Sequence, residues 1–276
     1  MSIKYAYLGP AGTFTEAALQ KIATQSDQFI AYANVTAALD AVRNGECQKA
    51  LVPIENSVEG VVARTLDELA IGEPLVITAE TTLPVSFSLM TLSDKNPTEI
   101  KSIATHPHAE SQCRSFIAKN YPNTQVIESS STAAAAKGLS KGDYDAAIAG
   151  SNAAKNYDLK VIAENIGDNT GAVTRFVLVE KPGNQPKATG KDRTSLAVFI
   201  ALDHAGALLE ILNEFAKHQV NLTFIQSRPT GSQLGHYHFI IDAEGHIEDK
   251  PISAALAGLK EICEDVRFLG SYPQAK

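Results

Sequence analysis

Residues 50–57, ALVPIENS, form an apolar run of strand length that ends in three polar side chains. A short and continuously apolar run of this kind is typical of a strand buried on both faces, as in a sheet covered by helices. In such folds the polar groups that follow a strand gather at the sheet edge where ligands bind. The stretch therefore predicts an α/β fold with Glu55, Asn56 and Ser57 at a ligand site. The alternative is that Asn56 or Ser57 only caps the helix expected around residues 61–69.

The sequence on either side alternates strand-like runs with helical patterns. Strand-like runs occupy residues 5–8, 50–54, 103–105, 124–127 and 146–149. This alternation predicts parallel sheets with helices on their faces. The extended stretch 75–90 is expected to carry the chain into a second lobe, and 163–179 to return it. Two lobes with a cleft between them would be a common place for a ligand.

Residues 181–193, KPGNQPKATGKDR, contain two Pro, two Gly and no bulky apolar side chain, which indicates a linker. After it, strand and helix patterns alternate in the order βαββαβ, through residues 195–202, 206–218, 221–226, 237–241, 252–262 and 266–269. This order predicts a ferredoxin-like module. We therefore expect a first domain at 1–180 and a second at 194–276. The lobes of the first would be 1–78 with 162–180, and 79–161.

The composition excludes several classes of protein. With 44% hydrophobic and 20% charged residues, the 276-residue chain is typical of globular proteins. Its net charge of -7 and the lack of a basic stripe argue against binding to nucleic acid. Cys47, Cys113 and Cys263 are too scattered for a disulfide framework or a zinc site. The sequence starts directly with a strand-like run and has no apolar segment of membrane-spanning length, so we expect a cytoplasmic protein without a membrane partner.

Thr174, Arg175 and Phe176 open an apolar run after the polar loop 167–171. A hydroxyl and a guanidinium at a strand end are a candidate site for a small anion. The alternative is an edge strand with an exposed Arg. Thr105 also follows a strand and is expected to face the cleft. Gln112 would lie one to two turns into a helix that starts near residue 107.

Two other motifs have structural alternatives. Thr13 and Glu16 have the spacing of a capping box, although backbone N–H groups of the preceding Gly-rich turn could hold a carboxylate. His106 and His108 have the spacing of a metal pair but lack a third ligand, so we expect no metal. The sequence contains no Gly-x-Ser-x-Gly, P-loop or Gly-x-Gly-x-x-Gly motif. We therefore expect no cofactor and no covalent nucleophile.

Taken together, these motifs resemble those of the bacterial prephenate dehydratases, and the tail resembles an ACT regulatory domain. The resemblance rests on residues 7–14 (YLGPAGTF), 53–57 (PIENS), 105–107 (THP), 112–113 (QC), 174–176 (TRF), 206–208 (GAL) and 227–229 (SRP). It implies a carbon–oxygen lyase that converts prephenate to phenylpyruvate, water and CO2 in L-phenylalanine biosynthesis. It also implies a catalytic domain with two lobes like those of periplasmic binding proteins. The essential hydroxyl would belong to Thr174.

The resemblance also implies which residues bind ligands. Substrate-binding residues would be Thr13, Glu55, Asn56, Ser57, Thr105, Gln112, Arg175 and Phe176. Paired ACT modules in a homodimer or homotetramer would bind L-phenylalanine as a feedback inhibitor. Effector-binding residues would be Asp203, Gly206, Ala207, Leu208, Asn221, Ser227 and Arg228. Gln226 and Ala205 depart from the family's usual Glu and Pro, which bears on the strength of the effector.

Three alternative functions remain open at this point. Arogenate dehydratase would catalyse the same elimination on a substrate with an amine in place of the ketone. A solute-binding protein would have the two expected lobes, but the appended module and the expected lack of a signal peptide count against it. A non-catalytic amino-acid sensor would have no use for the hydroxyl of Thr174.

Overall fold

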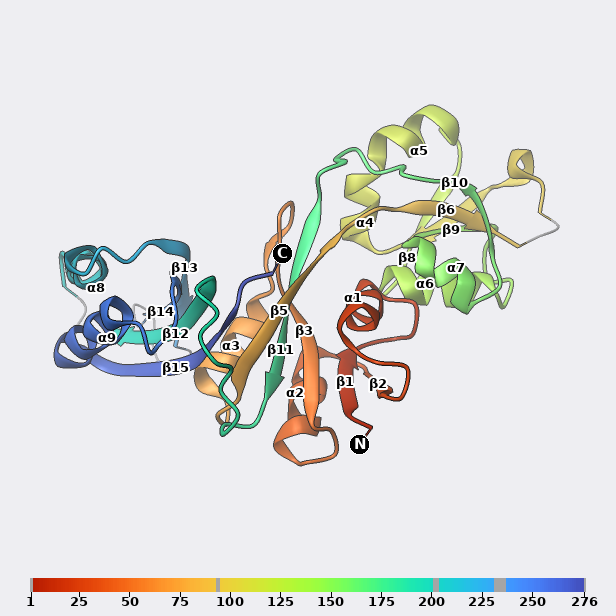
Figure 1. Ribbon diagram of the computed structural model, residues 1–276. Helices are drawn as coiled ribbons and strands as arrows, with labels where there is room; N and C mark the ends of the chain where they lie inside the picture. The colour runs from red at the N-terminus through yellow and green to blue at the C-terminus, as the bar shows by residue number, and fades with distance from the viewer. Residues whose placement is uncertain (1, 93–94, 201–203, 231–236, 276) are drawn as a thin grey trace. The chain divides into compact units, whose positions relative to one another are not determined.

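The computed structural model describes residues 2–92, 95–200, 204–230 and 237–275 (Figure 1). The chain divides into two compact units. Unit 1 comprises Met1–Ala38, Leu51–Val61 and Thr82–Phe176, and unit 2 comprises Leu39–Ala50, Val62–Thr81 and Val177–Lys276.

The first sheet has the strand order β2-β1-β3-β11-β5, with β4 paired to β3. Its strands are β1 (Lys4–Leu8), β2 (Gln28–Tyr32), β3 (Lys49–Asn56), β4 (Gly60–Val61), β5 (Val76–Pro84) and β11 (Val173–Glu180). The helices between them are α1 (Phe14–Ile22), α2 (Val35–Arg43) and α3 (Ala63–Ile71). Strand β1 is parallel to β2, and β4 is antiparallel to β3. Residues 50–54 are buried, as expected of an inner strand covered on both faces.

The second sheet, in unit 1, has the order β10-β6-β9-β7-β8. Its strands are β6 (Ser88–Thr91), β7 (Ser102–Thr105), β8 (Gln125–Glu128), β9 (Ala146–Ala149) and β10 (Lys160–Ala163). Its helices are η1 (Pro97–Glu99), α4 (Pro107–Gln112), α5 (Arg114–Asn120), α6 (Thr132–Leu139) and α7 (Ser151–Asn156). Ala147 and Ala149 of β9 are fully buried and pack with Ala135 and Ala136 of α6 in one core cluster.

The prediction of parallel sheets is only partly right, because both sheets are mixed. Strand β7 is parallel to β8 and β9, but β6 is antiparallel to β9 and to β10. Neighbouring parallel strands need a crossover connection between them, whereas antiparallel strands do not. Strand β6 enters the second sheet directly from β5, without a helix between them, and it runs the other way.

The third sheet, in unit 2, has the order β13-β14-β12-β15. It consists of β12 (Asp192–Ile200), β13 (Leu222–Pro229), β14 (Tyr237–Glu244) and β15 (Cys263–Pro273), with α8 (Ala207–Lys217) and α9 (Lys250–Ile262). All three pairings are antiparallel. Apolar residues of both helices and of β12 and β14 form one core cluster. The chain order β12-α8-β13-β14-α9-β15 confirms the predicted ferredoxin-like module.

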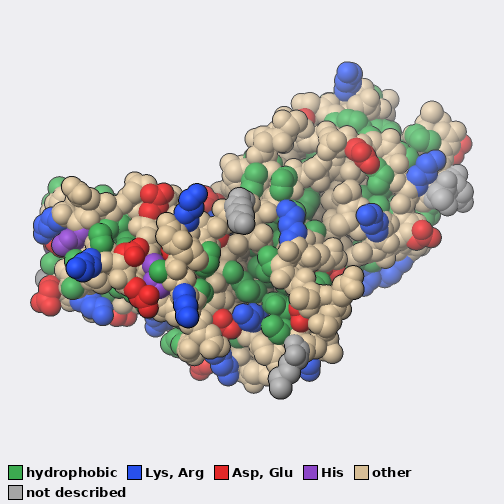
Figure 2. All heavy atoms as spheres, viewed as in Figure 1, with side chains coloured by type: hydrophobic (Ala, Val, Ile, Leu, Met, Phe, Trp, Pro, Cys, Tyr) green, Lys and Arg blue, Asp and Glu red, His purple; other side chains and the backbone are tan. Residues whose placement is uncertain are grey.

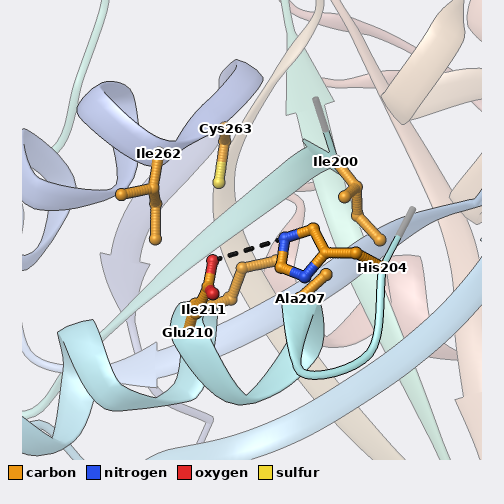
Figure 3. A pocket seen from close by; sticks show the side chains of 7 residues that line it. All are labelled: Ile200, His204, Ala207, Glu210, Ile211, Ile262 and Cys263. Atoms are coloured by element: carbon orange, nitrogen blue, oxygen red, sulfur yellow. Dashed lines mark ion pairs between the residues drawn. The ribbon is translucent and has the colours of Figure 1, made fainter. Parts of the chain in front are cut away.

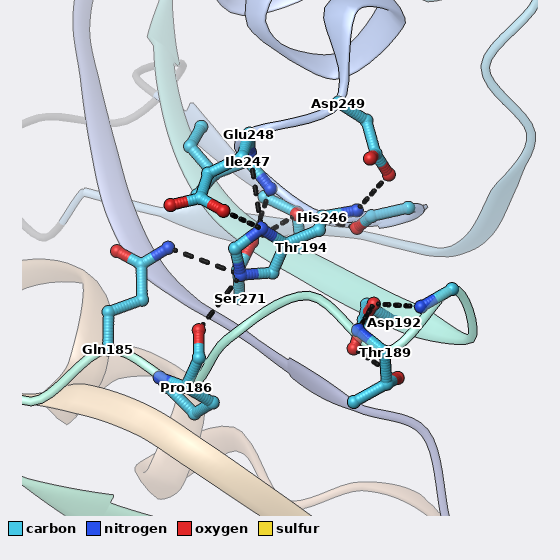
Figure 4. A network of polar contacts seen from close by, with 12 residues as sticks. Gln185, Pro186, Thr189, Asp192, Thr194, His246, Ile247, Glu248, Asp249 and Ser271 are labelled. Carbon is cyan, nitrogen blue, oxygen red and sulfur yellow. Dashed lines mark hydrogen bonds and ion pairs between the residues drawn. The ribbon is translucent and has the colours of Figure 1, made fainter.

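The segment before β12 is held to this module by a network of polar contacts (Figure 4). Buried His246 lies 3.1 Å through Nε2 from the carbonyl oxygen of Pro186 and 3.5 Å from Nε2 of Gln185. The Thr189 hydroxyl and backbone N–H both donate to the carboxylate of Asp192, at 2.7 Å each. The composition of residues 181–193 indicates a linker, and Gln185, Pro186 and Thr189 within it have hydrogen-bond partners.

Two general features bear on function. Within the described ranges, every helix is too short or too polar to cross a membrane. On the face shown in Figure 2, Lys and Arg side chains are interspersed with Asp and Glu, and neither sign gathers into a large patch.

Candidate active site

The Thr174 hydroxyl and the Asn56 amide meet across β11 and β3, 118 residues apart in sequence. Asn56 Nδ2 donates to Thr174 Oγ1 at 2.8 Å. Asn56 Oδ1 accepts from the backbone N–H groups of Val58 (2.8 Å) and Glu59 (3.0 Å), so the amide nitrogen must be the atom that faces Thr174. Thr174 Oγ1 therefore accepts a hydrogen bond and keeps its own proton. No described residue accepts that proton, which remains available for a ligand.

Ser57 fixes the start of β11 next to Thr174. Its backbone N–H donates to the carbonyl oxygen of Val173, and its Oγ accepts from the Val173 N–H, at 2.9 Å each. Neither Asn56 nor Ser57 caps α3, whose N-cap is Val62 and has no side-chain hydrogen bond. The capping alternative for these two residues is therefore wrong, and both position the strand that carries Thr174.

Gln112 joins this group through Glu59, a residue that the sequence did not single out as a site residue. Gln112 is buried at the end of α4, and its Nε2 donates to Glu59 Oε1 at 2.9 Å. The other carboxylate oxygen of Glu59 lies 3.7 Å from Nδ1 of His108. The sequence shows that Glu59 follows Asn56 by three residues. It does not show that Glu59 contacts Gln112 of α4, which lies 53 residues away in the chain.

Arg175 and Phe176 are both buried, at 8% and 1% exposure. Strand β11 lies between β3 and β5, so the alternative of an edge strand with an exposed Arg is wrong. The guanidinium of Arg175 lies 3.8 Å from Oε2 of Glu55, a looser ion pair than a direct hydrogen bond. A buried guanidinium beside a half-exposed carboxylate is an arrangement that can bind an anionic group.

Two predicted site residues have structural partners of their own. Thr105 is buried, and its hydroxyl donates to the carbonyl oxygen of Ile148 at 2.8 Å. Thr13 is the N-cap of α1, with its hydroxyl donating to the carbonyl oxygen of Leu8 and accepting from Glu16 N. The structure does not join either hydroxyl to the Thr174 group by a direct hydrogen bond among the described contacts.

The Gly-rich turn before α1 is also occupied by protein groups. The Gly12 N–H donates to Oε2 of Glu16 at 2.6 Å, and Asn152 Nδ2 donates to the carbonyl oxygens of Gly12 and Thr13. These contacts support the capping interpretation over the alternative that the turn holds a carboxylate.

The described residues offer neither a metal site nor an activated thiol here. His106 caps α4, with Nδ1 accepting from His108 N at 3.3 Å, and burial lowers its pKa, with His108 acting in the same direction. Among the residues placed in the structure, no three His, Cys, Asp or Glu are grouped to hold a metal. Burial, and then the charge of Asp168, raise the pKa of Cys113 to about 12. A thiol with that pKa is protonated and a poor nucleophile at neutral pH.

The ACT-like module contains a pocket of about 130 Å³ beside the start of α8 (Figure 3). It is lined by Ile200, His204, Ala207, Glu210, Ile211, Ile262 and Cys263. His204 Nε2 faces Glu210 Oε2 at 3.6 Å on one side, and three isoleucines, Ala207 and Cys263 form the rest of the wall. Among the predicted effector residues, Ala207 lines this pocket and Gly206 precedes it as the N-cap of α8.

The remaining predicted effector residues are spread over the module. Leu208, Asn221 and Ser227 are exposed, and Asp203 lies outside the described residues. Arg228 makes a bidentate ion pair with Asp67 of α3, with Nε–Oδ1 and Nη2–Oδ2 distances of 2.8 Å. This pairing within unit 2 is a structural contact that the sequence did not suggest.

Comparison with known proteins identifies the family. The prephenate dehydratase family model matches residues 5–184, and the ACT domain model matches residues 194–261. A prephenate dehydratase of Amycolatopsis methanolica is 46% identical over 99% of this chain and 89% of its own. The crystal structure of prephenate dehydratase from Arthrobacter aurescens in complex with L-Phe has a TM-score of 0.92 and 48% identity, over 98% of this chain and 90% of that one. A structure described as a quorum-quenching acylase, GqqA, has a TM-score of 0.86 and 26% identity, over 98% of each chain. The chain belongs to the prephenate dehydratase family and carries an ACT domain.

Proposed function

We propose that the protein converts prephenate to phenylpyruvate, water and CO2, the step that commits prephenate to L-phenylalanine. The observation that carries the mechanism is the Thr174 hydroxyl, which accepts from Asn56 and keeps its proton for a ligand. The identities of 46% and 48% to prephenate dehydratases over nearly the whole chain support the reaction itself.

The chemistry requires a hydrogen-bond donor where hydroxide leaves. The C4–OH bond breaks with its electron pair on oxygen, the ring carboxylate leaves as CO2, and its bonding electrons complete the aromatic ring. The departing hydroxide takes up one proton from solvent and becomes water. Hydroxide is a poor leaving group, so the transition state needs a donor to the departing oxygen. Thr174 supplies that donor. The hydrogen bond from Asn56 polarises the hydroxyl and strengthens its donation.

The dianionic substrate also needs cationic or amide partners. Buried Arg175 is suited to a carboxylate, because its planar guanidinium can donate two parallel hydrogen bonds to one. Gln112 supplies a buried amide to a polar group of the substrate. Ser57 acts through Val173, by holding the strand start that carries Thr174. Thr13, Thr105 and Phe176 are buried, and their contact with the substrate stays a prediction.

We propose that L-phenylalanine inhibits the enzyme through the ACT domain. The support is the Arthrobacter aurescens relative, whose structure was solved in complex with L-Phe. The pocket beside Ala207 combines apolar walls with the His204–Glu210 pair, which suits an apolar amino acid. The effector shifts activity only if it binds the less active state more tightly. A homodimer or homotetramer and a cytoplasmic location remain predictions, as do the boundaries of the catalytic region at 1–180 and of the ACT domain at 194–276.

One assay tests the function against its alternatives. The protein is incubated with prephenate, and phenylpyruvate is followed by its absorbance in alkali, with and without L-phenylalanine. Parallel reactions contain arogenate or an N-acyl amide. Formation of phenylpyruvate from prephenate, suppressed by L-phenylalanine, is the expected result. Faster turnover of arogenate than of prephenate would identify arogenate as the substrate. Cleavage of the acyl amide without prephenate turnover would favour the acylase activity named for GqqA.

A further inference from the structure

We propose that Glu59 is a positioning residue of the reaction, which fixes the Gln112 amide toward the substrate. This inference rests on the proposed function, because it assigns Gln112 a role in turning over prephenate. Glu59 lies on the turn between β3 and β4 and is bonded to two residues of the site. Its backbone N–H holds the Asn56 oxygen at 3.0 Å, and its carboxylate accepts from Gln112 Nε2 at 2.9 Å.

The two contacts of Glu59 respond differently to substitution. The hydrogen bond to Asn56 comes from the backbone and persists when the side chain is changed. The hydrogen bond to Gln112 comes from the side chain alone. A change in the Glu59 side chain therefore alters the orientation of Gln112 and leaves the hydrogen bond between Thr174 and Asn56 in place. Changes at Asn56 or Thr174 disturb that hydrogen bond itself.

The Glu59 carboxylate determines which way the Gln112 amide points. A carboxylate only accepts hydrogen bonds, so the amide nitrogen must face Glu59 and the amide oxygen must turn away. Gln112 is only 8% exposed, and its backbone carbonyl also accepts from Asp168 N. With its main chain held and its side chain aimed, Gln112 presents one carbonyl oxygen and one N–H to a ligand in a single orientation. Without Glu59 the amide is free to rotate, and a fraction of molecules would present it reversed.

The carboxylate itself is oriented from its other side. Glu59 Oε2 lies 3.7 Å from His108 Nδ1, while Oε1 faces Gln112. The Glu59 side chain is 29% exposed and that of His108 is 66% exposed, so the pair lies near the protein surface rather than in the core. A carboxylate near a dianionic substrate would not strengthen its binding through charge. Its contribution is therefore to geometry, and a neutral acceptor at the same place should replace it.

The test compares variants in steady-state turnover of prephenate by the full chain. Wild-type turnover is measured first, and its absence would contradict the proposed function rather than this inference. Glu59→Ala is expected to lower kcat/KM about 10- to 100-fold, the usual cost of losing a hydrogen bond to a charged group. Glu59→Gln, which can still accept from Gln112, is expected to stay within about fivefold of wild type. Glu99→Ala removes an exposed carboxylate of η1 in the same unit, so it is the matched control and should match wild type.

A double-mutant cycle with Gln112→Ala decides whether Glu59 acts through Gln112. The expected result is that Glu59→Ala adds little loss once Gln112 is already truncated. Each of three results would overturn the inference. The losses in kcat/KM of the two single variants could multiply in the double variant, Glu59→Ala could turn over at the wild-type rate, or Glu59→Gln could be as slow as Glu59→Ala. Glu59→Asp keeps the charge and the turn but withdraws the carboxylate by one methylene. If Glu59→Ala does not fold, wild-type turnover by Glu59→Asp would overturn the inference in its place.

Discussion

Replacing Asn56 by Asp reverses the hydrogen bond on which Thr174 depends, with little change in shape. The two backbone donors to Oδ1, from Val58 and Glu59, are kept, because a carboxylate accepts them as an amide does. The atom facing Thr174 Oγ1 at 2.8 Å changes from a donor nitrogen to an acceptor oxygen. The Thr174 proton must then turn toward that oxygen and away from the substrate.

The size of the effect follows from the loss of one transition-state donor. Such a loss costs on the order of 10²- to 10³-fold in kcat, or about 3 to 4 kcal/mol. Asn56→Ala removes the orienting amide but leaves the hydroxyl free to rotate toward the substrate, which should cost only about tenfold, the worth of one neutral hydrogen bond. The near-isosteric Asp variant should therefore be slower than the truncated Ala variant by about tenfold or more.

The assay is kcat for prephenate at saturating substrate, with Asn169→Asp as the matched control. Asn169 lies in the loop before β11 and uses only its side-chain oxygen, which accepts from Gly171 N, so Asp adds the same charge without removing a donor. The control should stay within about threefold of wild type. The Asn56→Asp deficit should shrink as the pH falls from 7 toward about 4, because a neutral carboxyl can donate to Thr174. An Asn56→Asp enzyme as fast as Asn56→Ala at pH 7 would refute the reasoning.

Three further predictions concern stability and are checked by thermal and urea unfolding. Asp67→Ala and Arg228→Ala should each lower the free energy of unfolding by about 1–2 kcal/mol, and they should be non-additive in the double variant, since they remove the same bidentate ion pair; full additivity would contradict the pairing. The hydrogen bond from Lys95, with further backbone and side-chain donors, holds the pKa of Asp145 at about 2, below its ordinary 3.8. Because the pKa of Asp145 is lower in the folded state than in the unfolded state, this stabilisation is complete above pH 4 and is lost as the pH falls toward 2. Asp145→Asn should lower the free energy of unfolding by about 1–2 kcal/mol at pH 7 and by almost nothing at pH 2, and a loss that is the same at both pH values would contradict this. Gly270→Ala should cost about 2–4 kcal/mol, because φ is +143° and a Cβ would lie 2.2 Å from a carbonyl oxygen of β5; an unchanged midpoint would show that the backbone yields there.

Local patterns in the sequence predicted the elements well. The buried run at 50–54 lies in β3, and the capping box places Thr13 as N-cap of α1, one residue before its first residue, Phe14. The order of elements after residue 192 is the one predicted. These features depend on periodicity and on contacts within a few residues, which a single sequence contains. Strand β2 and helix α7 were not anticipated, because β2 is only half-buried and α7 is six residues long without a side-chain cap.

The parts of the site that the sequence did not reveal all depend on long-range pairing. Hydrogen bonds join Asn56 to Thr174 across 118 residues and Gln112 to Glu59 across 53. The motif at 53–60 contains three acidic or amide side chains, and only the fold shows that Glu59 meets Gln112. Arg228 is a similar case, because the sequence cannot show that its partner is Asp67 on α3. The direction of β6 escaped prediction for the same reason, since pairing partners set it.

The most direct measurement is kcat for prephenate in Thr174→Val and Thr174→Ser. Valine keeps the branched shape beside Asn56 and removes only the hydroxyl, whereas serine keeps the hydroxyl and removes a methyl group. We predict that Thr174→Val loses at least about 100-fold in kcat with little change in KM, and that Thr174→Ser stays within about tenfold of wild type. A Thr174→Val enzyme that retains more than about a tenth of the wild-type kcat would contradict the role of this hydroxyl as the donor to the departing oxygen.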